Sequence, residues 1–419
     1  MDHSKKILII QSYNANKGDN SVIDSMLYSL RKYHYNISLT VFDPQKAKKE
    51  YNIDAFEYLL SFRKMKMAES KVQFIWACIC ELSWLMYSFL VLIFLKMGIS
   101  LPVPKRKEGI IKAYKESEVV IIPGGHFFTS FNSFMNNFSH YYALRFAQLI
   151  GKKTMVYAQT VGPYHNNRIG KIEKQMANRV LKKANVVTLR EADSLRNYSY
   201  TNAQVTAEAV FLKPVEKLDL NLEAYLPEKK IDFVVGVTIH HIYYKYYFTK
   251  DVYVELMADI FNAILEKYNC HILLIPMEDK YKTGGDRPII KEMLAKVDKR
   301  NGISMVTEDL TPLETANVIS LSDIFIGTKT HSIVYGLKTF TPTLGISYQE
   351  KSTEFMKMFN MEKFTIRMES LNVDDVMDIF SNIYKNREEI RKSMQEIYPK
   401  IVQKAEINNV LLNNLVNAR

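Results

Sequence analysis

The chain has 419 residues, a length that favours two or three domains and needs no disulfide or metal to complete a core. Hydrophobic residues make up 47% and charged residues 24%, so neither a disordered chain nor a multispanning membrane protein is expected. The cysteines at positions 78, 80 and 270 form no CxxC pair, which favours a reducing compartment and gives no zinc motif. The formal charge of +11 favours anionic partners, although a lysine-rich solvated surface also explains it.

Residues 1–212 predict a first α/β domain. The run KKILIIQSY at 5–13 is too short and too early for a secretory signal, and a polar loop and an amphipathic helix follow it. That is the order of a buried parallel strand opening a βα unit. Helices such as 131–150 and 168–184 alternate with further predicted strands within 36–42, 117–125, 153–163, 184–191 and 203–212. This alternation predicts an open, mostly parallel sheet with helices on both faces.

An apolar insertion interrupts this domain at about 61–107. Its centre, LSWLMYSFLVLIFL at 82–95, has fourteen residues, whereas a membrane-crossing helix needs roughly twenty. Basic residues flank it at 63, 64, 66 and 71 and at 105–107. We interpret it as a helix or helical hairpin that contacts a membrane surface through residues 72–101, with a core helix and a true span as alternatives.

Residues 213–230 lose the periodicity, contain two prolines and many charges, and predict a linker. A second Rossmann-like domain is predicted at 231–370, with strands within 232–240, 271–277, 303–308, 323–331 and 341–347. Thr311, Pro312 and Glu314 form a helix start signal within it. The C-terminal helices at 371–419 are expected to pack back toward the first domain. The predicted fold is α/β, with two Rossmann-like domains and a central cleft.

Ligands of parallel α/β sheets collect at the carboxyl ends of the strands. Gly124 and Gly125 follow one strand and are candidate substrate-binding residues, because glycine lets the backbone approach a ligand closely, with a tight turn as the alternative. Arg190 suits a carboxylate or phosphate, with a salt bridge to Glu191 or Asp193 as the alternative. His331 begins a helix beside Lys329, which favours anion binding over a structural histidine. Other strand-end candidates are Asn16, Gly18, Asp19, His126, Gln159, Gly162, His240, Glu278, Asp279 and the segment 348–351.

Several other chemistries are disfavoured. The chain has no GxSxG elbow, no Walker loop, no HExxH and no GxGxxG after a strand. His240 and His241 would point to opposite faces of a strand, so we expect no metal site there.

Segments over most of the chain resemble the polysaccharide pyruvyl transferase family: NKGDNSVIDSML, VVIIPGGHFF, YAQTVGPY, VVTLREADSLRNY and SDIFIGTKTHSIVYGLKTFTPTLGISYQEKSTEFMKMF. The resemblance implies a two-domain fold like that of GT-B glycosyltransferases. It also implies transfer of a pyruvate unit from phosphoenolpyruvate to paired sugar hydroxyls as a ketal. The runner-up function is that of a nucleotide-sugar glycosyltransferase on the same scaffold. A third reading is a binding protein whose site has decayed.

Carried over residue by residue, the resemblance assigns donor binding to Arg190, His331 and Lys351 and makes His331 the candidate general acid. Asp19 or Glu191 is expected to receive the hydroxyl proton. The family usually has arginine where Lys329 stands, which keeps the charge but loses the bidentate fork. We expect no cofactor, no metal and no nucleic acid partner. The expected partners are phosphoenolpyruvate and a glycan acceptor, for which a lipid-linked and a nucleotide-linked form are both open. The expected location is cytoplasmic, at most peripheral on the inner face of the membrane.

Overall fold

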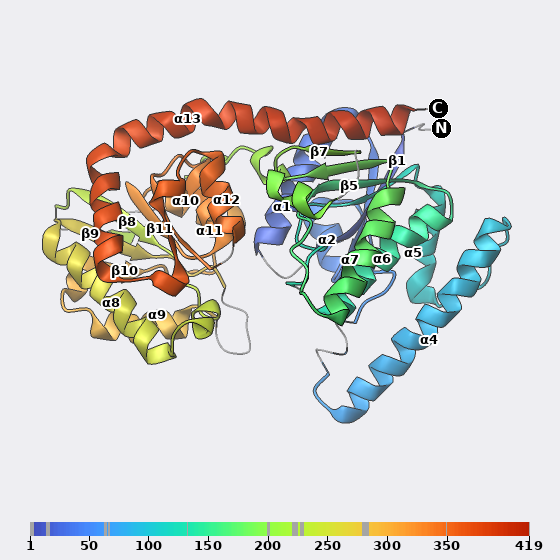
Figure 1. Cartoon of the computed structure of the whole chain (residues 1–419), viewed down its shortest axis with the longest axis horizontal. Helices are drawn as coiled ribbons and strands as arrows, with labels where there is room; N and C mark the ends of the chain where they lie inside the picture. The colour runs from blue at the N-terminus through green and yellow to red at the C-terminus, as the bar shows by residue number, and fades with distance from the viewer. Residues whose placement is uncertain are drawn as a thin grey trace. The chain divides into compact units, whose positions relative to one another are not determined.

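The computed structural model describes residues 4–13, 17–62, 65, 68–131, 133–198, 202–219, 225–226, 230–278, 285–348 and 350–418 (Figure 1). The chain divides into two compact units. Unit 1 contains Met1–Lys213 and Val402–Arg419, and unit 2 contains Pro214–Ile401. Each unit holds one parallel sheet accompanied by helices, so the α/β class and the two Rossmann-like halves predicted from the sequence are confirmed.

Unit 1 is built on a seven-stranded sheet of order β3-β2-β1-β4-β5-β6-β7, in which the direction of winding changes between β1 and β4. Its strands are short apolar runs because helices cover a parallel sheet. They are β1 (Lys6–Tyr13), β2 (Asn36–Val41), β3 (Asp54–Glu57), β4 (Val119–Ile122), β5 (Lys153–Gln159), β6 (Val186–Leu189) and β7 (Ala203–Val205). The helices are α1 (Lys17–Leu30), α2 (Pro44–Tyr51), α4 (Lys71–Lys96), α5 (Lys105–Glu116), α6 (Phe134–Leu149) and α7 (Arg168–Lys183).

Unit 2 repeats the plan with the order β10-β9-β8-β11-β12-β13, and its winding reverses between β8 and β11. The predicted capping box at Thr311 is confirmed, because its hydroxyl and Glu314 bond each other's backbone. The strands are β8 (Phe233–Val237), β9 (Cys270–Leu274), β10 (Ile303–Met305), β11 (Ile324–Gly327), β12 (Thr343–Ser347) and β13 (Thr365–Arg367). The helices are α8 (Lys250–Lys267), α9 (Arg287–Lys296), α10 (Pro312–Ser320), α11 (Thr330–Lys338), α12 (Glu350–Met358) and α13 (Val373–Asn417).

The segments predicted to join the domains are partly packed. In the predicted linker, the side chain of Asn317 accepts a hydrogen bond from the Leu218 backbone and donates one to Glu216, so this part is fixed to α10. The predicted C-terminal helices are a single helix, α13, of 45 residues. Within unit 1 its end is bonded to the sheet, since Tyr157 donates to Asn409 at 2.8 Å.

The apolar insertion forms one helix, α4, of 26 residues. The helix is longer than the apolar stretch 82–95 that the sequence singled out, and of the two forms predicted for it the structure has the single helix and not the hairpin. The helix starts earlier because Ser70 caps it by accepting the Gln73 N–H. In length and apolar composition α4 matches a membrane-crossing helix. Lys107, predicted as a flanking surface charge, is instead buried and donates to the carbonyls of Tyr58 and Leu59. The flanking residues at 63, 64 and 66 lie outside the described residues.

Candidate functional site

Two neighbouring parallel strands of unit 2, β11 and β12, bring His331 and Lys351 to one edge of the sheet. His331 is the second residue of α11, which follows β11, and Lys351 is the second residue of α12, which follows β12. The hydroxyls of their neighbours Thr330 and Ser352 share a buried hydrogen bond of 2.8 Å, so the two helix starts lie side by side. Backbone N–H groups and the helix dipole favour anions at such starts.

His240 lies at the same edge, after β8. The strand ends at Val237, so His240 and His241 lie in the loop beyond it, and the inference from strand geometry that they point to opposite faces does not apply. The buried His240 ring packs edge-on against Tyr348 with 4.8 Å between ring centroids. Burial and the positive charge of Lys329 lower the pKa of His240 well below its usual value, so this histidine is neutral near pH 7.

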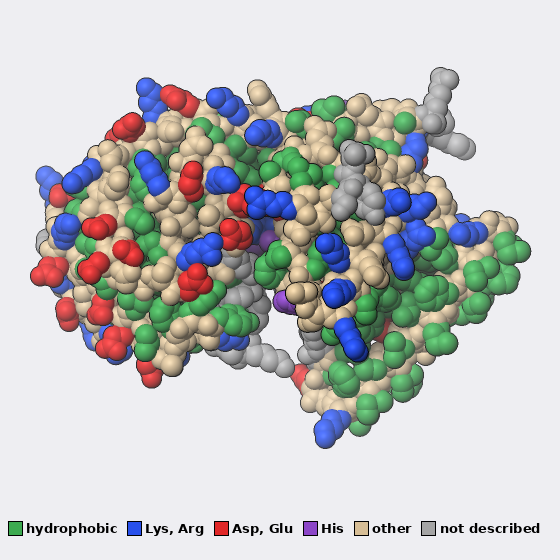
Figure 2. Space-filling model, in the orientation of Figure 1, with side chains coloured by type: hydrophobic (Ala, Val, Ile, Leu, Met, Phe, Trp, Pro, Cys, Tyr) green, Lys and Arg blue, Asp and Glu red, His purple; other side chains and the backbone are tan. Residues whose placement is uncertain are grey.

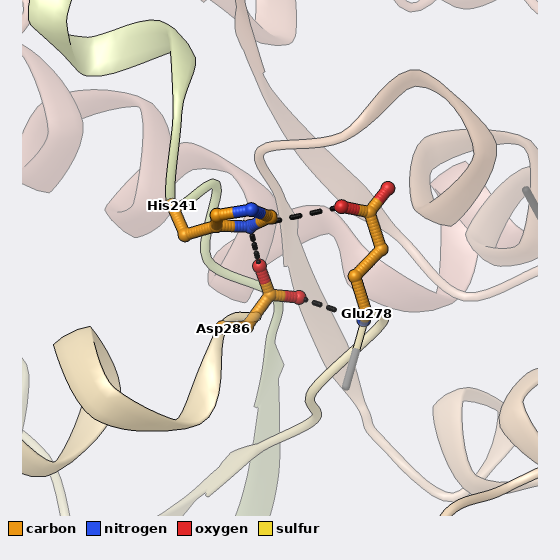
Figure 3. Close-up of side chains that lie close together, drawn as sticks. All are labelled: His241, Glu278 and Asp286. Carbon is orange, nitrogen blue, oxygen red and sulfur yellow. Dashed lines mark hydrogen bonds and ion pairs between the residues drawn. The ribbon is translucent and has the colours of Figure 1, made fainter. Parts of the chain in front are cut away.

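His241 belongs to a compact charged cluster with Glu278, Asp286 and Lys329, of which Figure 3 shows the first three residues. Its Nδ1 lies 2.6 Å from an oxygen of Asp286 and 3.7 Å from one of Glu278. The Lys329 ammonium lies 2.8 Å from the other oxygen of Asp286 and 3.4 Å from Glu278. Asp286 also accepts the backbone N–H groups of Met277 and Glu278, which fixes the loop after β9.

The ligand atoms of His241, Glu278 and Asp286 lie within 4.8 Å of one another, as metal ligands do, although the sequence led us to expect no metal site. Lys329 supplies the positive charge at this place, because its ammonium contacts both carboxylates. Burial alone raises the pKa of Asp286, but the hydrogen bond from His241 and the charge of Lys329 outweigh burial and lower it. The cluster is therefore a paired ion network that holds Lys329 in place.

Arg190 lies in unit 1, directly after β6, and is almost completely buried. Its guanidinium lies 3.0 Å from the carboxylate of Glu191 and 3.1 Å from that of Glu208, and it contacts the ring of His126 at 3.0 Å. Burial lowers the pKa of Arg190, whereas the charges of Glu208 and Glu191 raise it above its usual value. The salt bridge to Glu191, which the sequence left open, is present, and Glu208 provides a second carboxylate for the same guanidinium.

Further candidate site residues of unit 1 are Gly124, Gly125, Asp19 and Glu191. Gly124 packs closely, because a Cβ there would lie 3.2 Å from the carbonyl oxygen of Ala158. At Gly125 a Cβ would lie 2.8 Å from the ring of Phe127. Asp19 lies in the first turn of α1, and its side chain is outside the described residues. Glu191 accepts a hydrogen bond from Ser194 at 2.7 Å in addition to pairing with Arg190.

Sequence reasoning missed Asp286 and Glu208, the two buried carboxylates that compensate Lys329 and Arg190. Asp286 directly precedes α9 and could have been found as an acidic residue before an Arg-Pro helix start. Glu208 sits in the apolar segment AEAVFL, where a charge among buried residues signals a buried partner. His126 was a candidate by position, but its contact with Arg190 was not foreseen.

A model of the family described as polysaccharide pyruvyl transferase matches residues 16–350. The chain belongs to the polysaccharide pyruvyl transferase family. It is also similar to the amylovoran biosynthesis protein AmsJ of Erwinia amylovora, with 22% identity over 409 residues, covering 93% of this chain and 94% of that protein. Family membership and this relative support a general polysaccharide-modifying transferase.

Solved structures similar to this family member share its fold. A UDP-GlcNAc 2-epimerase from Neisseria meningitidis has a TM-score of 0.61 and 12% identity and covers 99% of this chain and 100% of that one. A glycosyltransferase from Rickettsia africae has a TM-score of 0.60 and 14% identity, with coverage of 99% and 100%. These likenesses show a GT-B type architecture.

Proposed function

We propose that the protein is a pyruvyl transferase that moves pyruvate from phosphoenolpyruvate onto a sugar of a cell-surface polysaccharide or its precursor. A proton adds to the methylene carbon of the donor, and one sugar hydroxyl attacks the adjacent carbon. The C–O bond to phosphate then breaks and releases phosphate, and a second hydroxyl attacks the same carbon and closes the ring. The two protons lost by the hydroxyls balance the proton gained by the methylene and the proton carried by phosphate.

The observation that carries the proposal is the pair of adjacent helix starts at α11 and α12, which bring a histidine and a lysine together in unit 2. Phosphoenolpyruvate has a carboxylate and a phosphate, and both suit helix N-termini and an ammonium group. In the proposal Lys351 binds the donor anion and His331 delivers the proton to the methylene carbon. The family resemblance assigns the donor to the same two residues.

In this proposal Lys329 orients the site and does not itself bind the donor. Its ammonium pairs with Asp286 and Glu278, so it fixes the residue before α11 and thereby the orientation of His331. The assignment of Arg190 to the donor rests on the resemblance, and a donor bound there would share the guanidinium with Glu191 and Glu208. Glu191, and Asp19 by its position in the chain, remain the proposed proton acceptors.

Calorimetric titration with phosphoenolpyruvate tests the proposal, with nucleotide sugars titrated in parallel. Lys351→Met removes a charge-assisted contact and should weaken donor binding roughly tenfold to hundredfold. Lys357→Met, at the far end of α12, is the matched control and should bind as the wild type does. His331→Gln should bind the donor but release no phosphate when acceptor glycan is added. Binding of a nucleotide sugar in place of phosphoenolpyruvate would reassign the protein to the glycosyltransferases.

The variant Arg190→Met tests whether the buried arginine contacts the donor or serves only in the ion network of unit 1. Loss of donor binding with an unchanged unfolding curve would support direct contact with the donor. A destabilised protein that still binds phosphoenolpyruvate would assign Arg190 to the ion network of unit 1 alone.

A further inference from the structure

Helix α4 packs against unit 1 through a mixed side that holds Glu81, Trp84, Ser88, Val91 and Leu92, and it turns a broad row of apolar side chains outward, where a helix on a soluble surface would carry polar ones. The Trp84 indole N–H donates to the carbonyl of Leu59 at 2.7 Å, and Ser88 is hydrogen-bonded to Tyr142. Glu81 is buried, with its carboxylate 3.7 Å from Arg106. These contacts fix the inner side of α4 to unit 1 and give each of these three polar side chains a partner there.

The opposite side of α4 is a continuous apolar surface, called here the outer face, and Figure 2 shows it as hydrophobic side chains gathered along the helix. At 3.6 residues per turn it covers roughly 140° of the helix circumference. Between the two ends of this fully described helix, Ser83 is the one polar side chain within that arc, and the only charged residue on it is Lys71, which stands at its edge in the first turn. The outer face consists of Val72, Ile75, Trp76, Ile79, Leu82, Met86, Phe89, Leu90 and Ile93, all of them exposed.

Charge is confined to the ends of this surface. Lys71 begins the helix and Lys96 ends it, and both are exposed. An apolar stripe with lysines at both ends matches the boundary of an anionic bilayer, where side chains enter the acyl region and ammonium groups meet headgroup phosphates. The stripe is also wider than the two-position seam by which paired helices associate, so its width favours lipid over a second copy of the chain.

We propose that α4 docks unit 1 onto an anionic lipid membrane, lying in the plane of the interface with its outer face in the boundary between headgroups and acyl chains. A span is disfavoured because the inner side of α4 packs on unit 1. Insertion across the bilayer would bring the Glu81–Arg106 pair and the charged helix α5 into hydrocarbon, at high cost. This proposal is independent of the reaction proposed above and concerns the location of the protein.

The test is co-sedimentation of the full chain with vesicles of phosphatidylcholine alone and of phosphatidylcholine mixed with phosphatidylglycerol. The variant Ile79→Ser/Met86→Ser/Ile93→Ser should lower the partition coefficient on the mixed vesicles at least tenfold. The matched control Ile169→Ser/Ile172→Ser/Val252→Ser changes three residues of similar exposure on α7 and α8 and should bind as the wild type does. Equal binding of the wild type to both kinds of vesicle would overturn the role of the lysines.

Tryptophan fluorescence gives a second readout, because the chain has two tryptophans with different surroundings. Trp76 is 66% exposed on the outer face, whereas Trp84 is buried against unit 1. Anionic vesicles should shift the emission to shorter wavelength, and Trp76→Phe should abolish the shift while binding persists. Binding that survives the triple outer-face variant would overturn the proposal. So would a wild type that ignores vesicles but forms a dimer in sedimentation velocity that the triple variant dissociates.

Discussion

The Lys329 ammonium lies 2.8 Å from a carboxylate oxygen of Asp286, whose side chain is completely buried. Removing one partner of a buried pair leaves an uncompensated charge, which costs about 3–5 kcal/mol. Lys329→Met should therefore lower the free energy of unfolding of unit 2 by about that amount. The double variant Lys329→Met/Asp286→Asn should cost less than the sum of the single changes, because each change removes the charge that the other leaves unpaired.

Urea unfolding followed by circular dichroism measures these differences. Lys250→Met is the control, since it breaks the exposed 2.9 Å pair with Glu292 on the same unit and should leave the midpoint unchanged. Additive costs in the double variant would show that Lys329 and Asp286 do not depend on each other.

The ion pair between Lys329 and Asp286 also affects whether the cluster can bind a divalent metal ion. Because Lys329 already contacts both carboxylates of the His241, Glu278 and Asp286 cluster, a metal ion would have to displace an ammonium group. We expect dialysis against a chelator to leave the melting temperature of the wild type unchanged. In the variant Lys329→Ala, added Zn²⁺ should raise the melting temperature, because the ammonium group no longer competes with a metal ion for the two carboxylates. A wild type that melts several degrees lower after chelation would assign the cluster to a metal.

The fold was predictable because its signals are local. Most of the strands are short apolar runs, and all of them have three to eight residues. Thr311, Pro312 and Glu314 mark a helix start within four positions. The sheet order follows from short connections and right-handed crossovers. The sequence did not predict the full length of helix α4, because Glu81 interrupts the apolar run without interrupting the helix.

The sequence predicted where the candidate site residues lie in the fold, but it did not predict which side chains they contact. Strand ends identify Arg190, Lys329 and His331, since ligands collect there. Whether a cation at such a place faces a ligand or an internal carboxylate depends on residues far away in sequence. Asp286 lies 43 positions from Lys329, and its contact depends on the packing of α9, which no local pattern encodes.

His140 gives unit 1 a pH dependence that can be measured. It is buried in α6, stacked on Phe127, and its Nδ1 is bonded to the carbonyl of Asn136. Burial lowers the pKa of His140 from 6.5 to about 4. Below pH 6.5 the unfolded chain takes up a proton that the folded chain does not bind, so stability falls until the pH reaches about 4. The loss amounts to about 3 kcal/mol at most.

His140→Gln removes this titration and should flatten the dependence of the unit 1 unfolding midpoint on pH between 6.5 and 4. His165→Gln, at an exposed position in the same unit, is the control and should keep the wild-type slope. The same steep slope in His140→Gln would mean that another buried group is responsible.

The variant Lys329→Arg tests whether the side chain at position 329 orients the start of α11 or binds the donor directly. The family usually has arginine here, and a guanidinium would pair with the Asp286 carboxylate through two parallel hydrogen bonds. Because the Lys329 charge faces Asp286 and Glu278, we expect the variant to bind phosphoenolpyruvate within about twofold of the wild type. Calorimetric titration measures this, with Lys351→Arg as the comparison at the proposed donor contact. A gain of tenfold or more in Lys329→Arg alone would place the side chain on the donor, because only a direct contact converts the bidentate fork into affinity.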